Sequence, residues 1–530
     1  MTGRYDAIIV GGGHNGLVTA AYLARAGWRV LVLERRAVLG GACVTEEVFP
    51  GYRVSTAAYL VSLFPEKIVR ELDLRRFGYH VWPKDPAYFS PLPDGRYFFM
   101  YPDQPRTCAA IARFSPRDAA RYPDYAAQIE RLARFIEPLL LRPPPNLPPR
   151  DLTDWRLLLD LARRLLRLGP ADLSALARLF AASVAEILDQ WFESEPLKVA
   201  LATDGVIGAP AGPASPGTGY VLLHHVMGGV GGVRGLWGFV KGGMGGLTQA
   251  LAAAARAAGA EIRTLAPVSR ILVRDGQAAG VVLADGSEYR ARVVVANTDP
   301  KRTFLDLVGP EALPPEFVAR IQAYRCTGVA FKINLALGEL PSYTALPGTA
   351  PGPQHRGTTH ICPSLEALER AWDDAKYGQP SREPLLEITI PTVYDPDLAP
   401  PGKHLLSIFA QYTPYQLRSG SWAEEKDRFV RRAIDLLAQY APNLPAAIEH
   451  VHALSPLDLE TEYGLTGGSL FHGDLRLDQL FVFRPAPGWA RYATPIRDLY
   501  LCGSGTHPGG GVTGMPGHNA AHEILRRTRR

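Results

Sequence analysis

Three glycines near the start of the chain have the spacing of a nucleotide-binding turn. Gly11, Gly13 and Gly16 form the pattern G-x-G-x-x-G within VGGGHNGL, and His14 and Asn15 lie between the second and third glycines. In such a turn the first glycine permits a tight bend, the second lets the backbone approach a pyrophosphate, and the third allows a helix to pack closely on a strand. The helix N-terminus offers free N–H groups to the phosphate. These residues therefore favour dinucleotide binding.

The elements that must position this turn follow in the expected order. An apolar run at 7–10 predicts a buried strand, residues from about 15 to 26 predict a helix, and RVLVLE at 29–34 predicts the next strand. The same glycine spacing also occurs in unrelated α/β proteins. The complete order of strand, turn, helix and strand favours the dinucleotide site over that alternative.

The acidic end of the second strand indicates which dinucleotide binds. Glu34 lies 18 residues beyond Gly16, where a carboxylate can accept hydrogen bonds from a ribose diol. Its charge repels a 2′-phosphate and so disfavours NADP, whereas the adjacent Arg35 and Arg36 are the one signal in favour of NADP. We therefore expect FAD or NAD.

A second glycine pair, Gly40 and Gly41, begins the segment GGACVTEEVFPG. A cysteine just beyond a nucleotide site, here Cys43, is typical of flavin disulfide reductases, whose second redox cysteine follows five positions later. Val48 occupies that position. The glycine-rich stretches at 228–235 and 242–247 have the wrong spacing for a second nucleotide turn, which would be needed for the NAD(P)H that such enzymes use. The pair more simply lets the chain pass close to a second phosphate or to the ribityl chain of FAD. Ala42 stands where many FAD-binding oxidases have an arginine.

Composition limits the remaining function classes. The 530 residues are 47% hydrophobic and 21% charged with a net charge of +5, which is typical of a globular protein of two or three domains. Basic residues are scattered rather than interleaved with aromatic ones, so nucleic acid is not an expected partner. Five widely spaced cysteines favour a reducing compartment over a disulfide framework or a zinc site, and no metal is expected.

No targeting or membrane-spanning segment is apparent in the sequence. The first predicted strand starts almost at once, and no uncharged apolar stretch reaches the about 20 residues that span a bilayer. We expect a cytoplasmic protein, and peripheral contact with a membrane surface stays open.

Residues 152–192 have helical periodicity and follow a proline-rich linker at 141–151. The first helix gathers apolar side chains toward one face, with arginines largely elsewhere. That face consists of Trp155, Leu158, Leu159, Ala162, Leu165 and Leu166. Two interpretations stay open: a lid or membrane-surface helix that admits an apolar substrate, or an ordinary amphipathic helix packed on the core.

Two later segments return the chain to the dinucleotide site. Residues 239–300 predict a glycine turn, an alanine-rich helix and strands separated by DGQ and DGS turns, with Val268 near the adenine. Residues 498–525 predict a strand, a glycine-rich loop and a helix whose N-terminus faces the flavin pyrimidine and ribityl chain. The contacts expected from this loop are Gly503, Gly511, Val512 and Thr513.

The strand pattern at 328–341 contains the one catalytic candidate. Apolar residues at odd positions from 329 to 337 alternate with Lys332 and Asn334, which share the other side with alanines. Lys332 could hold a water beside a flavin, or it could simply face solvent. No acid–base pair is apparent in the sequence, which suits a reaction with little polar catalysis.

These motifs resemble those of the phytoene desaturase-related flavoproteins. The similarity is carried by VGGGHNGL, LER, GGACVTEE, FVKGGMGGLTQAL and LYLCGSGTHPGGGVTG, and is strongest to the branch of the pyridine nucleotide-disulphide oxidoreductase domain-containing proteins. It implies an α/β fold with a Rossmann-type, glutathione reductase-like FAD-binding domain that is discontinuous, at 1–85, 235–310 and 486–530. It also implies an antiparallel-sheet substrate domain at 86–150 and 311–485 and a helical lid or membrane-facing subdomain at 151–234.

Combined with the glycine motifs, the resemblance gives a set of expected FAD contacts. They are Gly11, Gly13, His14, Asn15, Gly16, Glu34, Arg35, Gly40, Gly41, Val268, Gly503, Gly511, Val512 and Thr513. By a more distant likeness to amine oxidases, Lys332 falls where those enzymes keep a flavin-facing lysine.

The resemblance also implies an activity. Related carotenoid desaturases remove hydrogen from long polyenes, with FAD that is reoxidised by oxygen or a quinone. We therefore expect an FAD-dependent oxidoreductase that removes hydride from an apolar, isoprenoid or carotenoid-like substrate. A flavin amine oxidase and a flavin-bound scaffold with little turnover are the alternatives.

Overall fold

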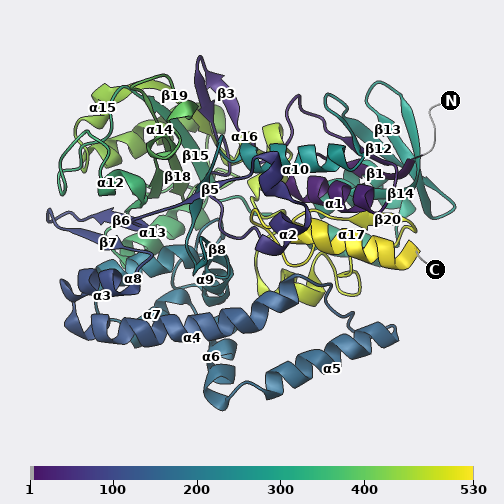
Figure 1. The fold of residues 1–530 in the computed structure, drawn as a ribbon, viewed down its shortest axis with the longest axis horizontal. Coiled ribbons are helices and arrows are strands. Elements are labelled where there is room, and N and C mark those ends of the chain that lie inside the picture. Colours follow the sequence, from purple (N-terminus) through teal and green to yellow (C-terminus); the bar gives the residue numbers. More distant parts are fainter. Residues whose placement is uncertain (1–4, 529–530) are drawn as a thin grey trace.

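Two seven-stranded sheets, side by side, organise the molecule, and a group of helices lies along one edge of it (Figure 1). The computed structural model describes residues 5–528. Both ends of the described chain lie beside the first sheet, at the right of the view. The limits of the three expected domains stay a prediction.

The first sheet joins three separated parts of the chain. Its parallel strands are, in spatial order, β11 (Glu261–Arg263), β2 (Val30–Leu33), β1 (Tyr5–Val10), β14 (Glu288–Ala296) and β20 (Leu499–Leu501). β12 (Val268–Arg274) and β13 (Gln277–Leu283) extend β14 as an antiparallel meander. Val10 pairs with Leu33 on one side and Ala296 on the other, so the loops that follow these strands meet at one edge. This is the α/β, Rossmann-type arrangement expected from the sequence.

Three helices cover one face of this sheet: α1 (His14–Arg25), α10 (Gly245–Ala257) and α17 (Met515–Thr528) (Figure 1). Leu17, Leu251 and Ile524 from these helices are fully buried against the strands in one hydrophobic cluster. The opposite face packs against Phe304 and against Phe317 of α11 (Pro315–Ala323). The helix expected at about 15–26 is α1, and the alanine-rich helix is α10.

The second sheet is largely antiparallel. Its order is β19 (Ile448–Leu454), β15 (Ala330–Leu337), β18 (His404–Gln411), β17 (Leu385–Thr389), β16 (Thr358–Ile361), β6 (Tyr88–Pro91) and β7 (Tyr97–Met100), with β16 and β6 parallel. Phe331, Ile333 and Leu335 of β15 pack on one face in a cluster with Phe429 of α14 (Trp422–Ala438). The alternation expected at 328–341 is therefore confirmed, and Lys332 lies on the other face.

Seven helices occupy residues 104–226, after the first two strands of this sheet in the chain. They are α3 (Gln104–Ala112), α4 (Pro116–Leu140), α5 (Leu152–Leu166), α6 (Pro170–Ala181), α7 (Val184–Trp191), α8 (Glu195–Ala202) and α9 (Thr218–Val226). The remaining elements are α2 (Glu66–Glu71), α12 (Pro353–Arg356), α13 (Leu365–Lys376), α15 (Leu444–Ala447), α16 (Pro456–Tyr463) and three short two-stranded ribbons. The ribbons pair β3 (Glu46–Phe49) with β4 (Tyr52–Val54), β5 (Val81–Pro83) with β10 (Gly238–Val240), and β8 (Gly229–Val230) with β9 (Val233–Arg234).

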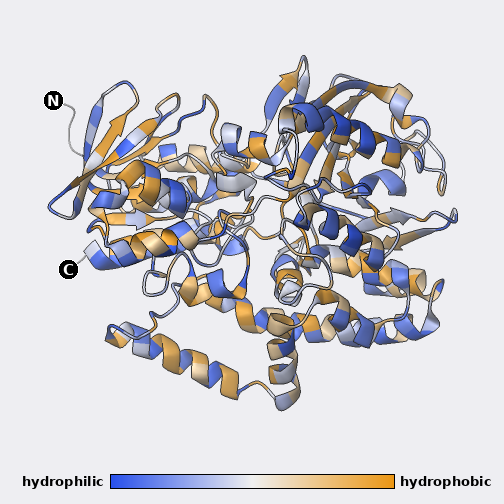
Figure 2. Ribbon diagram, turned by 180° about the vertical axis from the view of Figure 1, so that it is seen from behind, coloured by the Kyte–Doolittle hydropathy of each residue, from blue (hydrophilic) through white to orange (hydrophobic). Residues whose placement is uncertain are grey.

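Helix α5 stands apart from the rest of this group and shows apolar residues on its outside (Figures 1 and 2). Trp155 is 57% exposed and Leu166 is 85% exposed, and Leu152 and Leu159 are also exposed. Asp154 is its one buried residue. The interpretation that this helix packs its apolar face on the core is therefore wrong for α5. Within residues 5–528, no helix is long and apolar enough to cross a membrane.

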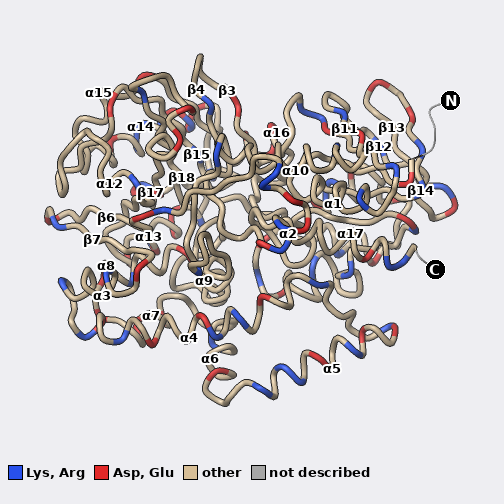
Figure 3. The backbone as a smooth tube through the Cα atoms, viewed as in Figure 1, with Lys and Arg blue, Asp and Glu red and all other residues tan. Residues whose placement is uncertain are grey.

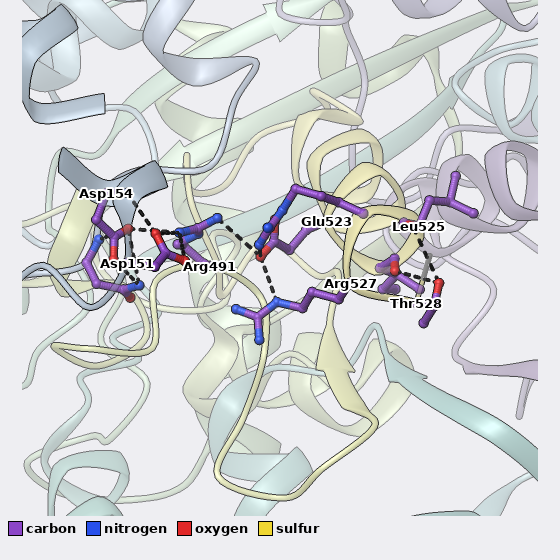
Figure 4. Close-up of polar contacts among 10 residues, drawn as sticks. Asp151, Asp154, Arg491, Glu523, Leu525, Arg527 and Thr528 are labelled. Atoms are coloured by element: carbon purple, nitrogen blue, oxygen red, sulfur yellow. Dashed lines mark hydrogen bonds and ion pairs between the residues drawn. The ribbon is translucent and has the colours of Figure 1, made fainter. Parts of the chain in front are cut away.

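A buried ion-pair network attaches the start of α5 to the first sheet (Figure 4). Arg491 donates to the buried Asp154 at 2.8 Å and lies 3.5 Å from both Asp151 and Glu523. Glu523 belongs to α17 and also accepts hydrogen bonds from Arg526 and Arg527 of that helix. Because Arg491 is matched by several carboxylates, α5 is held at its first turn although most of its length is exposed.

Candidate active site

A cavity of about 650 Å³ runs from the carboxyl edge of the first sheet to the space between the second sheet and helices α4, α8 and α9. Its first part is lined by the loops that follow β1 and β2. Its second part is lined by the face of β15, β16 and β17 that is opposite α14. The nucleotide turn and Lys332 therefore share one continuous cavity.

The glycine turn presents open backbone to this cavity. Gly13 is the N-cap of α1, and the helix has neither a side-chain cap nor an acidic residue in its first turn, so its first N–H groups are free for an anion. A Cβ on Gly13 would lie 2.9 Å from Asn297 Nδ2. A Cβ on Gly16 would lie 2.4 Å from the carbonyl oxygen of Gly11. The turn thus tolerates no side chain at the third glycine.

Glu34 connects the second strand to the turn. One carboxylate oxygen accepts a hydrogen bond from the Gly12 N–H at 2.8 Å and the other accepts from the Arg36 N–H at 2.9 Å. Glu34, Arg35 and Val268 line the same end of the cavity. Each carboxylate oxygen keeps a lone pair, so contact with a ribose diol remains open to it.

The second glycine pair packs against the first. Gly40 and Gly41 have φ values of +129° and +59°, which side chains disfavour, and the Gly40 N–H donates to the Gly12 oxygen at 2.9 Å. A Cβ on Gly41 would lie 3.4 Å from Gly13 Cα. Cys43 is buried behind this loop, its pKa raised by burial, and no disulfide forms among the described residues. The loop therefore brings backbone to the cavity and offers no dithiol.

Three of the expected cofactor residues lie just behind the cavity wall. Gly16 and Gly503 are spacers, since a Cβ on Gly503 would lie 2.7 Å from the Asn297 oxygen. Thr513 is buried, and its hydroxyl accepts a hydrogen bond from the Met515 N–H at 3.2 Å at the start of α17. The other eleven line the cavity, and they are Gly11, Gly13, His14, Asn15, Glu34, Arg35, Gly40, Gly41, Val268, Gly511 and Val512. Their contacts with a cofactor stay a prediction.

Buried polar atoms without partners support a polar ligand at this end. His14 Nε2, Asn15 Oδ1 and His472 Nδ1 are buried and have no hydrogen-bond partner in the described part of the chain, and all three residues line the cavity. Buried polar atoms of folded proteins are nearly always paired. Together with the bare glycine turn, these atoms fit FAD, whose phosphates, ribityl hydroxyls and ring carbonyls supply both donors and acceptors.

Lys332 lies on the cavity face of β15. It is only 2% exposed, so the alternative that it faces solvent is wrong. Its amine donates to Ser407 Oγ and lies 3.9 Å from the centre of the Tyr59 ring. Burial lowers the pKa of Lys332 to about 7, although the nearby Glu387 opposes that shift. The amine can therefore gain or lose a proton near neutral pH.

Three polar side chains, Lys332, Glu387 and His360, lie in one row across the second sheet, which the sequence did not predict. Lys332 of β15 pairs with Phe409 of β18, Phe409 pairs with Glu387 of β17, and Glu387 pairs with His360 of β16. All four line the cavity. A charged residue inside an apolar strand, as in LLEITI, was the one available signal.

Lys84 and Asp204 complete this group from outside the sheet. Lys84 directly follows β5 and donates to Thr358 Oγ1, and burial lowers its pKa to about 8. Asp204 lies in the short 3-10 helix Thr203–Gly205 that follows α8, and desolvation together with Glu387 raises its pKa to about 7. Titratable groups therefore line the cavity although no acid–base pair is apparent in the sequence, because tertiary contacts gather residues that are far apart along the chain.

Comparison with known proteins places this geometry in a family. The model of the family described as flavin containing amine oxidoreductase matches residues 16–524. Pyridine nucleotide-disulfide oxidoreductase domain-containing protein 2 of Rattus norvegicus is 44% identical over 99% of this chain and 94% of its own length. A phytoene desaturase (lycopene-forming) of Pseudescherichia vulneris is 27% identical over 96% of each chain.

Solved structures agree with the fold. Cyclohexylamine oxidase from Brevibacterium oxydans IH-35A superposes with a TM-score of 0.56 and 17% identity, with 100% of each chain covered. At that identity the likeness concerns the fold alone. It agrees with the α/β, Rossmann-type fold described above.

Proposed function

This chain belongs to the flavin containing amine oxidoreductase family, with FAD as its cofactor, and we propose that it dehydrogenates an apolar substrate of the isoprenoid class. The family and branch expected from the sequence are thereby confirmed. When bound, FAD would supply a hydride acceptor, and we propose oxygen or a quinone as the electron acceptor that reoxidises it. The protein's own contribution is to hold the substrate in a dry cavity beside the flavin and to manage protons there.

The observation that carries the proposal is the character of the cavity beyond the glycine turn. Apolar and aromatic side chains from the helices form its wall opposite the second sheet, among them Tyr122, Tyr125 and Ile129 of α4 and Leu222 of α9. Such a wall stabilises a hydrocarbon chain by removing its surface from water. The similarity to a phytoene desaturase supports the same substrate class.

Extraction of the purified protein with organic solvent tests this proposal. We expect a neutral isoprenoid lipid, in an amount comparable with the flavin, because an apolar cavity of this size retains its ligand during purification. Recovery of an amine in place of a lipid would contradict the proposal.

An amine oxidase is the second candidate, favoured by the aromatic residues around Lys332. Tyr59, Phe409 and Trp237 line the cavity there, and aromatic faces attract cations. Lys84 and Lys332 oppose this reading, since both can carry a positive charge that would repel an ammonium group. We expect anaerobic addition of putrescine or cyclohexylamine to leave the flavin oxidised.

Lys332 is proposed to hold a water and to supply positive charge beside the flavin. Because its pKa is lowered to about 7, the ammonium form is present below that pH and is lost above it. We expect reoxidation by oxygen to slow as pH rises through about 7, since the charge that develops on oxygen loses its stabilising partner. Lys332→Met should slow reoxidation roughly 100-fold at pH 6. The variant should also lose the change in reoxidation rate that we expect near pH 7. Stopped-flow absorbance of the pre-reduced protein measures both.

The control for Lys332→Met is Lys376→Met on the surface of α13. Lys376 is half exposed and pairs only with Asp373 of its own helix. Its replacement should leave both the rate and its pH profile unchanged. If Lys332→Met keeps full turnover and full reactivity with oxygen, Lys332 has no such role.

Helix α5 is proposed to lie on an anionic lipid surface, from which an apolar substrate could enter. Its exposed apolar residues Trp155 and Leu159 would enter the lipid, and the exposed Arg156, Arg163 and Arg167 would meet phosphate groups. Basic residues recur along α5 (Figure 3). Trp155→Asp with Leu159→Asp should lower binding to phosphatidylglycerol vesicles at least about tenfold, since each buried apolar side chain contributes about 1.5–3 kcal/mol. Vesicle flotation measures the bound fraction.

A matched pair of substitutions elsewhere controls for lost surface hydrophobicity. Tyr377, directly after α13, and Leu457, on α16, are exposed residues with large apolar side chains. Tyr377→Asp with Leu457→Asp should leave flotation unchanged. Equal flotation of the α5 variant and the unaltered protein would refute the lipid contact.

A further inference from the structure

The wall of the cavity near Lys332 contains a group of polar residues whose function the desaturation of a hydrocarbon does not explain. This polar cluster consists of Lys84, Tyr88, Asp204, His360 and Glu387, all of which line the cavity, and all but the partly exposed Asp204 are buried. They come from β6, β16 and β17, from the residue directly after β5, and from the short 3-10 helix Thr203–Gly205 that follows α8. Burying so many polar groups beside an apolar chain is unfavourable unless a ligand or a partner pairs with them.

Glu387 is the fully paired member of the polar cluster. One oxygen accepts a hydrogen bond from the Tyr59 hydroxyl at 2.6 Å and the other accepts from His360 Nε2 at 3.0 Å. Burial alone would raise the pKa of Glu387, but these hydrogen bonds and the nearby Lys84 hold it below its usual value. A carboxylate can only accept, so His360 Nε2 carries the hydrogen of this bond, and Nδ1 is an acceptor in the tautomer that has its hydrogen on Nε2.

Two atoms of the polar cluster have no partner. The hydroxyl of Tyr88 and Nδ1 of His360 are buried without any hydrogen bond to the described residues. Tyr88 is 7% exposed and His360 4% exposed, and their rings meet edge to face with centroids 4.8 Å apart. Both residues line the cavity, so two neighbouring rings of its wall carry an unpaired donor, the Tyr88 hydroxyl, and an unpaired ring nitrogen, His360 Nδ1. A group that both accepts and donates one hydrogen bond would satisfy both atoms.

The charges around these two atoms balance. Lys84 and Lys332 can each carry a positive charge, and Asp204 and Glu387 can each carry a negative one. A ligand that brought a full charge would leave this group of four unbalanced in a buried place. The arrangement therefore suits a neutral oxygen rather than a carboxylate or an ammonium group.

We propose that the polar cluster binds a hydroxyl group of the substrate, so that the natural substrate is an isoprenoid-type alcohol rather than a hydrocarbon. The substrate oxygen accepts from the Tyr88 hydroxyl, and the substrate O–H donates to His360 Nδ1. The carbon chain continues along Tyr122 and Ile129 of α4. The choice of an isoprenoid chain rests on the proposed function, whereas the hydroxyl subsite rests on the polar cluster alone.

Three probes of one chain length test this subsite on the flavin-loaded protein: geranylgeraniol, the hydrocarbon with a methyl group in place of its CH2OH, and geranylgeranoic acid. Binding is followed without oxygen by quenching of tryptophan fluorescence, since Trp237 lines the cavity. We expect the alcohol to bind about tenfold more tightly than the hydrocarbon and more tightly than the acid. Equal binding of alcohol and hydrocarbon, or tighter binding of the acid, would overturn the proposal.

Tyr88→Phe removes the hydroxyl that is proposed to donate to the substrate oxygen, and it keeps the aromatic ring. It should abolish the preference for the alcohol and leave the affinity for the hydrocarbon unchanged. The matched control is Tyr343→Phe, since the Tyr343 hydroxyl is also buried without a partner among the described residues but lies in the core under the second sheet. That control should keep the preference. A Tyr88→Phe protein that still prefers the alcohol would mean that the polar cluster holds water only.

The outcome separates this inference from the proposed function. Selective binding of the alcohol without bleaching of the flavin by any probe would contradict the dehydrogenase and leave the hydroxyl subsite in place. Bleaching by the hydrocarbon, with no preference for the alcohol in binding, would support the dehydrogenase and refute the subsite.

Discussion

Gly16→Ala is expected to yield a folded protein that has lost most of its FAD. A methyl group at this position would lie 2.4 Å from the carbonyl oxygen of Gly11, which is backbone and cannot rotate away. The turn must then move off the N-terminus of α1, and the phosphate loses both its N–H donors and the favourable end of the helix dipole. Overpacking of this kind costs about 1–3 kcal/mol, so FAD affinity should fall about 10- to 100-fold.

Visible absorbance per chain after gel filtration measures the loss of flavin, and circular dichroism checks that the variant folds. Gly169→Ala is the matched control, because Gly169 precedes α6 with a φ of −66° and has no atom within 4 Å of an added Cβ. It should keep full flavin content. A Gly16→Ala protein with unchanged flavin would mean that the cofactor does not lie on this turn.

Arg484→Met is expected to destabilise the whole protein by roughly 4 kcal/mol or more. Arg484 is fully buried and donates hydrogen bonds to carbonyl oxygens of two loops, at distances from 2.7 to 3.2 Å. The acceptors are Phe471, Gly473, Asp474, Gln479 and Ser504. Methionine fills similar space without donors and leaves four of these buried oxygens unpaired, since the Asp474 oxygen also accepts from Gln479 Nε2 at 3.4 Å. Urea unfolding followed by circular dichroism measures the change.

Arg476→Met is the control for this position. Arg476 lies in one of the same loops but is half exposed, and it pairs only with the neighbouring Asp478. Its loss should cost less than about 0.5 kcal/mol. Because Phe471, His472 and Ser504 line the cavity, Arg484→Met should also weaken FAD binding. Equal unfolding midpoints for the two variants would contradict the role given to Arg484.

The sequence is informative where the signals are local. The turn at Gly11–Gly16 and the following helix depend on contacts within a few residues, and α1 begins and ends within one residue of the predicted limits. The alternation around Lys332 also predicts correctly which residues of β15 enter the core. In both cases backbone geometry alone determines which side chains face inward.

Longer-range features are beyond such reasoning. His360 and Glu387 meet only because β16 and β17 pair in one register, and Lys84 and Asp204 approach them from unrelated segments. Helix α4 is also not predicted from the sequence, because Pro123 and Pro138 lie inside it and proline normally marks a helix boundary. The sequence of α5 also does not show that its apolar face is exposed. Helical periodicity identifies an apolar face but does not indicate whether the rest of the protein packs against it.

Anaerobic titration of the flavin tests the central claim most directly. The purified protein, shown by its spectrum to contain oxidised FAD, is mixed without oxygen with an isoprenoid polyene such as phytoene, with geranylgeraniol and with an amine. The account predicts that an isoprenoid bleaches the flavin, with a desaturated or otherwise oxidised product equal in amount to the FAD reduced, and that the amine does not. Bleaching by the amine alone, or by none of the three, would contradict it.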